Sequence, residues 1–470
     1  MTTTQTICVR QADGQSARKK VGRSKHAAVG TIDRDPIALL EANSEGRVKA
    51  LVPLRYGRMA VSPFTFFRGS AILQAHDLSQ TPHSGITVPI CGDAHLANFG
   101  GFATPERELI FDLNDFDEVA VGPWEWDLKR LSASLVVASQ HMGFDRNVAG
   151  NLVLSATREY RDRMSEYAQC GTLDLWYDRV TFARMVETAQ TAEGRRRLER
   201  GMAKATGRTH GSMLKRMAVQ RDGRWIMQDT PPSLFHPAGP ASLLRPGTRW
   251  DDVKVWQGSL ADSFDEYRST LTSERQELLS HFHIQDMAFK VVGVGSVGTF
   301  CFVVLLTDGW DKPLFLQIKE ARQSVIAKYF SASEPAHQGE RVVTGQRLLQ
   351  AASDIFLGWA SGPDGRHFFF RQLRDMKISA DIETLDATLL AGYARICGWA
   401  LARAHAKASG KAVELSAYIG RSDKLPEALV EYSLAYAVQN EKDYRVFMDA
   451  CRSGQLEART DEDMAADFRV

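Results

Sequence analysis

The sequence predicts an α+β fold in which a helical part and a β-rich part come from different stretches of the chain. Residues from about 127 to 215 carry apolar side chains at the spacing of one helix face, which predicts several helices. Residues 286–320 are rich in β-branched and aromatic residues around a sharp turn, which predicts antiparallel strands. Helical periodicity returns at 337–352 and strongly at 385–408, and it continues toward the end. We therefore expect helices on both sides of the β-rich part.

Changes in composition divide the chain into four stretches. Residues 1–48 are polar and contain a short basic run, which predicts a flexible lead-in. Residues 49–250 begin with short apolar runs that end in polar loops, continue into helices, and finish in a segment rich in proline and glycine. Residues 251–380 form the β-rich stretch, and we expect the helices of residues 381–470 to complete the helical part.

Charge and hydropathy limit the partners that we expect. The 58 Lys and Arg residues nearly match the 57 Asp and Glu residues, and a net charge of +1 excludes a surface that is basic throughout. The basic stretch at 195–216 has no interleaved aromatic residues, so we interpret it as a solvated helix face rather than a nucleic-acid signal. The longest apolar run, at 300–306, is too short to cross a bilayer. No apolar signal segment opens the chain and the cysteines are scattered, so we expect a cytoplasmic protein with reduced thiols.

Two loops rich in acidic residues carry the strongest chemical signal. Each follows a short apolar run, at 86–90 and 108–111, which predicts that the loops lie at the ends of neighbouring strands. Asp93 and Asn98 are close enough in one loop to point at the same centre, and Asp115 offers an oxygen from the second loop. Magnesium prefers such a set of few protein oxygens, because its other positions stay with water and phosphate.

The spacing of these residues resembles the catalytic region of aminoglycoside phosphotransferases and choline kinases, which are protein kinase-like enzymes. The shared pattern is Gly-Asp-x-His-x-x-Asn, a hydrophobic strand, Asp-Phe-Asp, and Gly-Pro-x-x-x-Asp-Leu, here between Gly92 and Leu128. The resemblance implies that Asp93 is the base for an acceptor hydroxyl and that Asn98 binds a metal. It also implies that Asp115 holds magnesium on the nucleotide phosphates and that Asp127 braces the catalytic loop.

A kinase-like enzyme also needs a cation on the nucleotide phosphates and a glycine-rich cover. No lysine lies between residues 49 and 129, so neither part can precede the catalytic loop in the usual way. Downstream, Gly293, Gly295 and Gly298 separate two predicted strands, and Lys319 lies at the end of a third. The β-formers after the last glycine favour a kinase-like hairpin over a dinucleotide-binding unit, which needs a helix there. A plain hairpin with glycines in its turn is the remaining alternative.

Two further segments fit the resemblance and suggest the order of the parts. Residues 368–374 resemble the strand and hinge that hold adenine. Residues 401–406 end a long predicted helix that resembles the helix leading into the catalytic loop in this superfamily. Because this helix lies downstream of the loop at 91–98, we expect a two-lobed kinase-like fold that is circularly permuted, with residues 251–380 as the nucleotide-binding lobe.

The sequence leaves alternative roles open for three further side chains near the predicted site. The glutamate partner of Lys319 would come from Glu334 or Glu340, and we choose Glu340. His95 would orient the catalytic loop or bind a phosphate, or else be structural. Arg68 would recognise an anionic substrate or form an internal ion pair.

The chain as a whole resembles a bacterial family known as domain of unknown function 2252. The resemblance covers most of residues 30–460 and has several specific segments. They are Arg55-Tyr56-Gly57-Arg58-Met59, Ser62-Pro63-Phe64, Arg341-Val342-Val343 and Gly345-Gln346-Arg347. The family name implies no activity.

Our first hypothesis is an ATP- and magnesium-dependent phosphotransferase that acts on an unidentified hydroxyl acceptor, either a small molecule or a protein. Nucleotidyl transfer, with ATP bound in the reverse direction on the same fold, is one alternative. A metal-dependent phosphoesterase that uses Asp93, His95, Asp112 and Asp115 is another. A nucleotide-sensing pseudokinase or scaffold is the candidate outside the enzymes.

Overall fold

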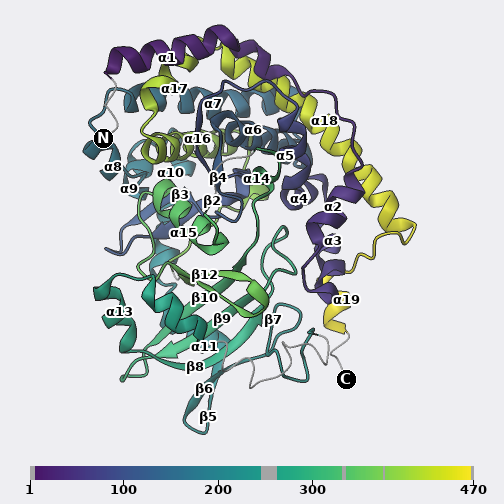
Figure 1. The fold of residues 1–470 in the computed structure, drawn as a ribbon, viewed down its shortest axis with the longest axis vertical. Coiled ribbons are helices and arrows are strands. Elements are labelled where there is room, and N and C mark those ends of the chain that lie inside the picture. The colour runs from purple at the N-terminus through teal and green to yellow at the C-terminus, as the bar shows by residue number, and fades with distance from the viewer. Residues whose placement is uncertain (1–5, 245–261, 331–334, 374–375, 467–470) are drawn as a thin grey trace.

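A computed structural model describes residues 6–244, 262–330, 335–373 and 376–466. Helices gather in one part of the molecule, and a six-stranded sheet forms the other part (Figure 1). The predicted α+β class is therefore confirmed. The predicted boundary at 250/251 lies outside the described residues.

The helical part is built from segments that are far apart in the sequence. Helix α16 (Ala387–Ser409) packs along α7 (Arg146–Tyr167), and α18 (Lys424–Arg452) packs against α6 (Trp124–His141). Figure 1 shows these late helices beside the early ones. Helix α6 is buried on nearly every side, because neighbours cover it all around.

The N-terminal stretch differs from the predicted flexible lead-in. Residues Ile7–Lys20 form α1, which lies against α17 (Ala412–Ile419) at the edge of the helical part (Figure 1). Arg10 pairs with Glu414 at 2.7 Å, and Arg18 Nε donates to the carbonyl oxygen of Tyr418 at 2.8 Å. Arg18, which belongs to the basic run of the predicted lead-in, thus helps to hold α1 against a partner 400 residues away.

The β-rich part is one antiparallel sheet with the strand order β11-β12-β10-β9-β8-β7. Its inner strands β9 and β10 are buried along almost their whole length. In β10, Lys319 lies opposite Cys301 of β9 and Phe369 of β12. The strands are β7 (Leu234–Phe235), β8 (His283–Lys290), β9 (Cys301–Thr307), β10 (Pro313–Ala321), β11 (Gly358–Ser361) and β12 (His367–Gln372).

Two short strand pairs connect the helical part to the two loops rich in acidic residues. Strand β1 (Thr87–Ile90) pairs with β4 (Ala120–Pro123), directly before α6. Strand β2 (Phe99–Ala103) pairs with β3 (Leu109–Leu113). The loops after β1 and β3, which carry the predicted acidic residues, therefore lie near the start of α6.

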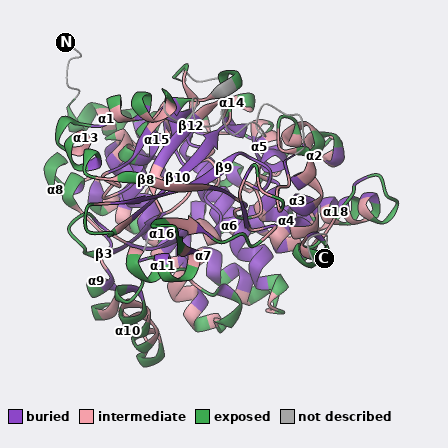
Figure 2. Cartoon of the chain, turned by 90° about the horizontal axis from the view of Figure 1, so that it is seen from below, coloured by how far each residue is buried: buried purple, intermediate pink, exposed green. Residues whose placement is uncertain are grey.

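The remaining helices and strands surround the helical part and the sheets. The basic stretch at 195–216 lies mostly on α10 and α11, and most of its cationic residues are exposed, as expected of a solvated face (Figure 2). No described helix has the length and apolar character needed to cross a membrane. The other labelled elements are α2 (Pro36–Ser44), α3 (Val52–Ala60), α4 (Pro63–Gly69), α5 (Ala71–Ser79), α8 (Thr172–Tyr177), α9 (Phe182–Glu187), α10 (Ala192–Thr206), α11 (His210–Met217), β5 (Ala218–Arg221), β6 (Arg224–Met227), α13 (Ser273–Ser280), α14 (Val325–Tyr329), α15 (Gln338–Leu349) and α19 (Asp461–Ala466).

The contact between α16 and α7 gives a first prediction. A Cβ atom at Gly398 would lie 2.1 Å from the carbonyl oxygen of Ala156, so Gly398→Ala must push the two helices apart. We expect it to lower the free energy of unfolding in urea by about 1–3 kcal/mol. Gly392→Ala, in the same helix with open space around it, is the control, and we expect it to be neutral or to stabilise by about 1 kcal/mol. Equal effects of the two variants would contradict the close packing.

Candidate functional site

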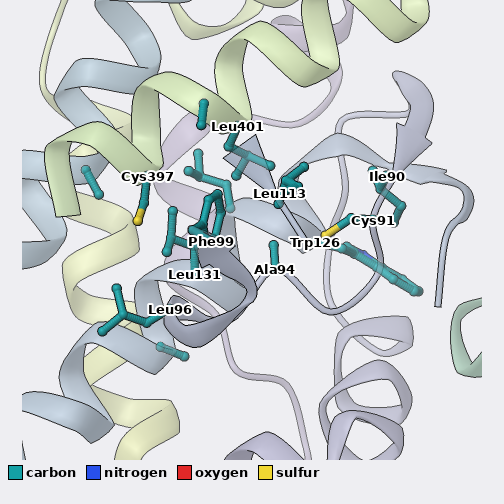
Figure 3. Close-up of a cluster of buried hydrophobic side chains, with 14 of the residues drawn as sticks. Ile90, Cys91, Ala94, Leu96, Phe99, Leu113, Trp126, Leu131, Cys397 and Leu401 are labelled. Carbon is teal, nitrogen blue, oxygen red and sulfur yellow. The ribbon is translucent and has the colours of Figure 1, made fainter. Parts of the chain in front are cut away.

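The loop after β1 is fixed by its apolar residues. Cys91, Ala94 and Leu96 are buried in the core that also contains Phe99 and Leu401, and Figure 3 shows these side chains together beneath the loop. The short 3₁₀ turn Leu96–Asn98 ends the loop. Because the apolar side chains point into the core, the polar residues between them are left on the opposite side, where they face a cavity.

The backbone at the start of this loop has an anchor at the first turn of α6. Asp127 Oδ2 accepts a hydrogen bond from the backbone N–H of Cys91 at 2.7 Å, and Oδ1 accepts one from Gly92 at 2.9 Å. Gly92 has a φ of +79°, and a Cβ atom there would lie 2.1 Å from the carbonyl oxygen of Glu118. His405 of α16 also contacts Asp127 Oδ2, at 3.2 Å. The bracing that the resemblance implied for Asp127 is present as hydrogen bonds.

Asp93 lies at the cavity and has one strong partner. Arg130 Nε of α6 donates to Asp93 Oδ1 at 2.7 Å, and the same guanidinium bonds to Gln74 Oε1 and to the carbonyl oxygen of Phe67. Burial raises the pKa of Asp93 to about 6, although Arg130 acts in the opposite direction. The carboxylate is thus held in place and titrates near the pH at which a general base must be ready.

His95 is neutral and supports the loop. Its Nδ1 accepts the backbone N–H of Ala97 at 3.2 Å, which leaves Nε2 facing Asp93 Oδ2 at 3.8 Å. Burial lowers the pKa of His95 well below its ordinary value, and the nearby charges of Arg130 and Arg68 lower it further. The side chain therefore orients the loop without adding charge.

Asn98 joins the two acidic loops. Its side-chain Nδ2 donates to the backbone carbonyl oxygen of Asp93 at 2.8 Å. The backbone carbonyl oxygen of Asn98 accepts the backbone N–H of Asn114 at 2.9 Å. In the second loop, Asp115 Oδ1 accepts the backbone N–H of Asp117 at 3.2 Å. The predicted metal residues Asn98 and Asp115 consequently line the same cavity as Asp93.

Lys319 reaches this site from the sheet, but its partner is not the predicted one. Its Nζ forms an ion pair with Asp117 Oδ2 and lies 4.0 Å from Asp115 Oδ2. No ion pair between Lys319 and Glu340 occurs in the described residues. Glu340 instead lies in the first turn of α15, where its backbone N–H donates to His337 Nδ1. The buried strand lysine finds its counter-charge in the loop rather than on the following helix.

Lys319, Asp115 and Asp117 interact electrostatically, and their pKa values shift in different directions. Burial opposes the charge on Lys319, but Asp115 and Asp117 overcome it and raise the pKa of Lys319. Burial likewise opposes the charge on Asp115, and Lys319 lowers the pKa of Asp115 nevertheless. Burial and the neighbouring Asp115 raise the pKa of Asp117. Of the two carboxylates, Asp115 therefore stays ionised more readily than Asp117.

The glycine-rich loop between β8 and β9 is held by arginines. Arg47 Nη1 donates to the carbonyl oxygens of Gly295 and Val297 at 2.8 and 2.7 Å, and Arg58 Nη1 donates to that of Gly293 at 2.7 Å. The carbonyl oxygen of Gly298 accepts the backbone N–H of Val48 at 2.7 Å.

A side-chain hydrogen bond also connects the glycine-rich loop to the second acidic loop. Ser296 Oγ donates to Asp117 Oδ2 at 3.2 Å, so the glycine loop contacts the same carboxylate as Lys319.

These parts surround one cavity of about 370 Å³. Asp93, Asn98, Asp115, Gly293 and Gly295 all line it, whereas Gly298, Lys319 and Glu340 do not. The structure therefore brings most of the predicted site residues to one place, with Lys319 behind the acidic loop.

Sequence reasoning missed Asp117 and Arg47. Asp117 has a signal, because it is the second acid of Asp-Phe-Asp, two residues after Asp115. Arg47 has none, because its contacts with the glycine loop join residues about 250 positions apart.

The oxygen atoms of the acidic loop suit a magnesium ion. Asp117 Oδ1 is buried and has no hydrogen-bond partner among the described residues. The described chain holds no group of three or more His, Cys, Asp or Glu side chains arranged for a metal. A site with few protein ligands, completed by water and phosphate, is the arrangement that magnesium accepts.

Comparison with known proteins supports one assignment. The family model described as "Uncharacterized protein conserved in bacteria (DUF2252)" matches residues 47–450, which is most of the chain. Neither a curated protein nor a solved structure was found to match.

The anchoring of the loop after β1 by Asp127 can be tested directly. Asp127→Ala leaves the backbone N–H groups of Cys91 and Gly92 without their acceptor, and we expect a loss of about 2–6 kcal/mol in unfolding free energy. Hydrogen exchange should show early loss of protection at these two amides. Asp449→Ala, at an exposed ion pair, is the control and should change stability by less than about 0.5 kcal/mol. Unchanged amide protection in Asp127→Ala would contradict the anchoring role.

Proposed function

We propose that this chain, which belongs to the bacterial DUF2252 family, is an ATP- and magnesium-dependent phosphotransferase with a circularly permuted, two-lobed kinase-like fold. The observation that carries the proposal is the meeting of two distant segments. Lys319 and Asp117 are 202 residues apart and form an ion pair beside the cavity that holds Asp93 and Asn98. A cation, a glycine loop and two acidic loops around one cavity are the parts that phosphoryl transfer requires.

The arrangement of the sheet supports a nucleotide-binding lobe. The glycine loop connects the successive strands β8 and β9, Lys319 lies on the next strand, β10, and α15 follows before β11. Kinase-like enzymes place a glycine-rich loop over the phosphates and a lysine on the third strand, followed by a helix. The pairing of Lys319 with Asp117 departs from the usual lysine–glutamate pair.

Contacts of α16 support the proposed permutation. Arg403 Nη2 pairs with Asp112 Oδ1 at 2.8 Å, both side chains being fully buried, and His405 reaches Asp127. Just beyond the helix, Lys411 Nζ donates to the carbonyl oxygen of Thr87 at 2.7 Å, at the first residue of β1. The end of α16 is thus one side chain away from the strand that leads into the catalytic loop.

In the proposed reaction, a phosphoryl group moves from ATP to the hydroxyl of the acceptor. Asp93 accepts the proton of the acceptor hydroxyl as its oxygen forms a bond to the γ-phosphorus of ATP. The bond from that phosphorus to the bridging oxygen breaks, and ADP leaves with the electron pair. Asn98, Asp115 and Asp117 would hold magnesium, which neutralises charge on the phosphates when it is bound. Lys319 would add its positive charge to the phosphates, and the glycine loop would cover them.

Nucleotide binding is the first test. Purified protein should melt at a higher temperature with ATP and magnesium than with ATP or magnesium alone. A ligand at 100 times its Kd adds about 2.7 kcal/mol to the stability of the folded state. Lys319→Ala and Asp115→Ala should each abolish this shift, because the two residues come from the two segments that meet at the site.

Lys442→Ala, on the exposed surface of α18, is the matched control and should keep the full shift. Absence of a shift with ATP, ADP and GTP over a wide concentration range would contradict the proposed function.

The pH dependence of turnover tests the role of Asp93. Because the base must be ionised and its pKa is about 6, kcat/KM should fall about tenfold for each pH unit below 6. The measurement is release of ADP from ATP with water as the acceptor. Asp93→Asn should bind ATP and magnesium normally but lose about 10²-fold or more in rate.

The products distinguish the alternatives. Pyrophosphate in place of ADP would indicate nucleotidyl transfer. Hydrolysis of a phosphate ester that is unaffected by Lys319→Ala would indicate a phosphoesterase. Binding without any turnover in the wild-type protein would indicate a nucleotide sensor.

A further inference from the structure

The cavity is lined by four cationic side chains that lack an acidic partner. They come from four separate segments, and none of them forms an ion pair with a carboxylate in the described part of the chain. These residues are Arg47, Arg68, Arg322 and Lys328. Cations that share a cavity without counter-ions repel one another, so such a group favours an anionic ligand.

The hydrogen bonds of these side chains leave their charge uncompensated. The strongest bonds of Arg47 and Arg322 go to uncharged carbonyl oxygens, those of Gly295 and Asn43 among them. Arg68 has a buried Nε without a partner, and no hydrogen bond of its guanidinium occurs within the described residues. Lys328 lies at the exposed rim. Arg68 is therefore the cation with the most unused hydrogen-bonding capacity.

The acids that face the cavity do not neutralise these cations. Three of these acids form ion pairs with cations that do not line the cavity, so their negative charge is already neutralised. The pairs are Asp93 with Arg130, Asp117 with Lys319, and Glu320 with Arg366. Asp115, the fourth acid, lies 4.0 Å from the same Lys319. Burial raises the pKa of Glu118, the fifth, to about 7, so this acid is partly uncharged near neutral pH.

Arg68 and Asp93 line the same cavity, and the charge of Asp93 partly offsets the lowering of the Arg68 pKa by burial. The carbonyl oxygen of Arg68 would be 3.4 Å from a Cβ atom at Gly295, so this residue touches the glycine loop. Arg130 of α6 donates to Asp93 Oδ1 and also to the carbonyl oxygen of Phe67, the residue before Arg68. A ligand group that binds Arg68 would thus place its neighbouring atoms near the carboxylate of Asp93.

We propose that the acceptor is an anionic alcohol, a hydroxyl compound that carries a phosphate or carboxylate group, and that Arg68 binds this oxyanion while the hydroxyl faces Asp93. This inference rests on the proposed function. Arg68 suits the task because a guanidinium offers a planar pair of donors to an oxyanion. Lys328 adds charge at the entrance. The oxyanion has a second source, the γ-phosphate of ATP, which the experiment separates.

The experiment measures binding of inorganic phosphate by calorimetry at constant ionic strength, with and without saturating ADP and magnesium. We expect Arg68→Ala to weaken phosphate binding about tenfold or more in both conditions, which is about 1.4 kcal/mol. Arg68→Lys should recover part of the affinity. Arg452→Ala, an exposed arginine at the end of α18, is the matched control and should bind phosphate like the wild type.

A second arm separates the acceptor from the nucleotide. The affinities of Arg68→Ala for ATP and for ADP, both with magnesium, should stay within about twofold of wild type, because the residue serves the acceptor. A selective loss of ATP affinity would assign Arg68 to the γ-phosphate and overturn the inference. Phosphate binding that is absent in the wild type, or unchanged in Arg68→Ala, would also overturn it.

The two proposals fail in different ways. If no nucleotide binds but Arg68-dependent phosphate binding remains, the phosphotransferase proposal falls and Arg68 is an anion site of another kind, which overturns the acceptor assignment. If nucleotide binds and phosphate does not, only the acceptor assignment falls. Melting of each variant without ligand shows whether it is folded, and the lysine variant provides the test if the alanine variant is not.

Discussion

The site depends on one buried carboxylate, that of Asp127. It accepts hydrogen bonds from two backbone N–H groups at the start of the loop after β1, and it contacts His405 of α16. Three segments that are far apart in the chain therefore meet at one side chain at the start of α6. An acidic residue in the first turn also suits the positive end of the helix. The position of Asp93 follows from this anchor, because Asp93 comes directly after Gly92.

The second organising feature is the separation of charge across the loop. Four of the five acidic residues at the cavity lie beside cations that are outside its lining, whereas the four cations in the lining have no acidic partner among the described residues. This arrangement gives the two central carboxylates different properties. The pKa of Asp93 is raised by burial, and that of Asp115 is lowered by Lys319 despite its burial. A pair of acids with separated pKa values can supply a base and a charged metal ligand at the same pH.

The features that could be predicted from the sequence are those that depend on residues close together along the chain. The strands β1 and β3 and the helices α6, α15 and α16 follow from periodicities that a short window contains. The family assignment is confirmed, and the loops at 91–98 and 112–118 could be located from their spacing. The partner of Lys319 could not be predicted, because Asp117 is 202 residues away and only the packing of the sheet on the loop selects it over Glu340. The helix α1 within the lead-in could not be predicted for the same reason, since Arg10 and Glu414 come together only in the folded state.

The order of the segments matters less to the proposed activity than their contacts. In the proposed permutation, α16 and β1 remain neighbours through Lys411 and Thr87, although the backbone between them is not continuous. The contacts that replace this connection are the buried pair of Arg403 with Asp112 and the contact of His405 with Asp127. A buried ion pair whose partner is removed leaves an uncompensated charge, which costs about 3–5 kcal/mol. In that proposal, the side chains at the end of α16 take over a task that a peptide bond performs in the usual chain order, and the loop after β1 keeps its support from the same helix.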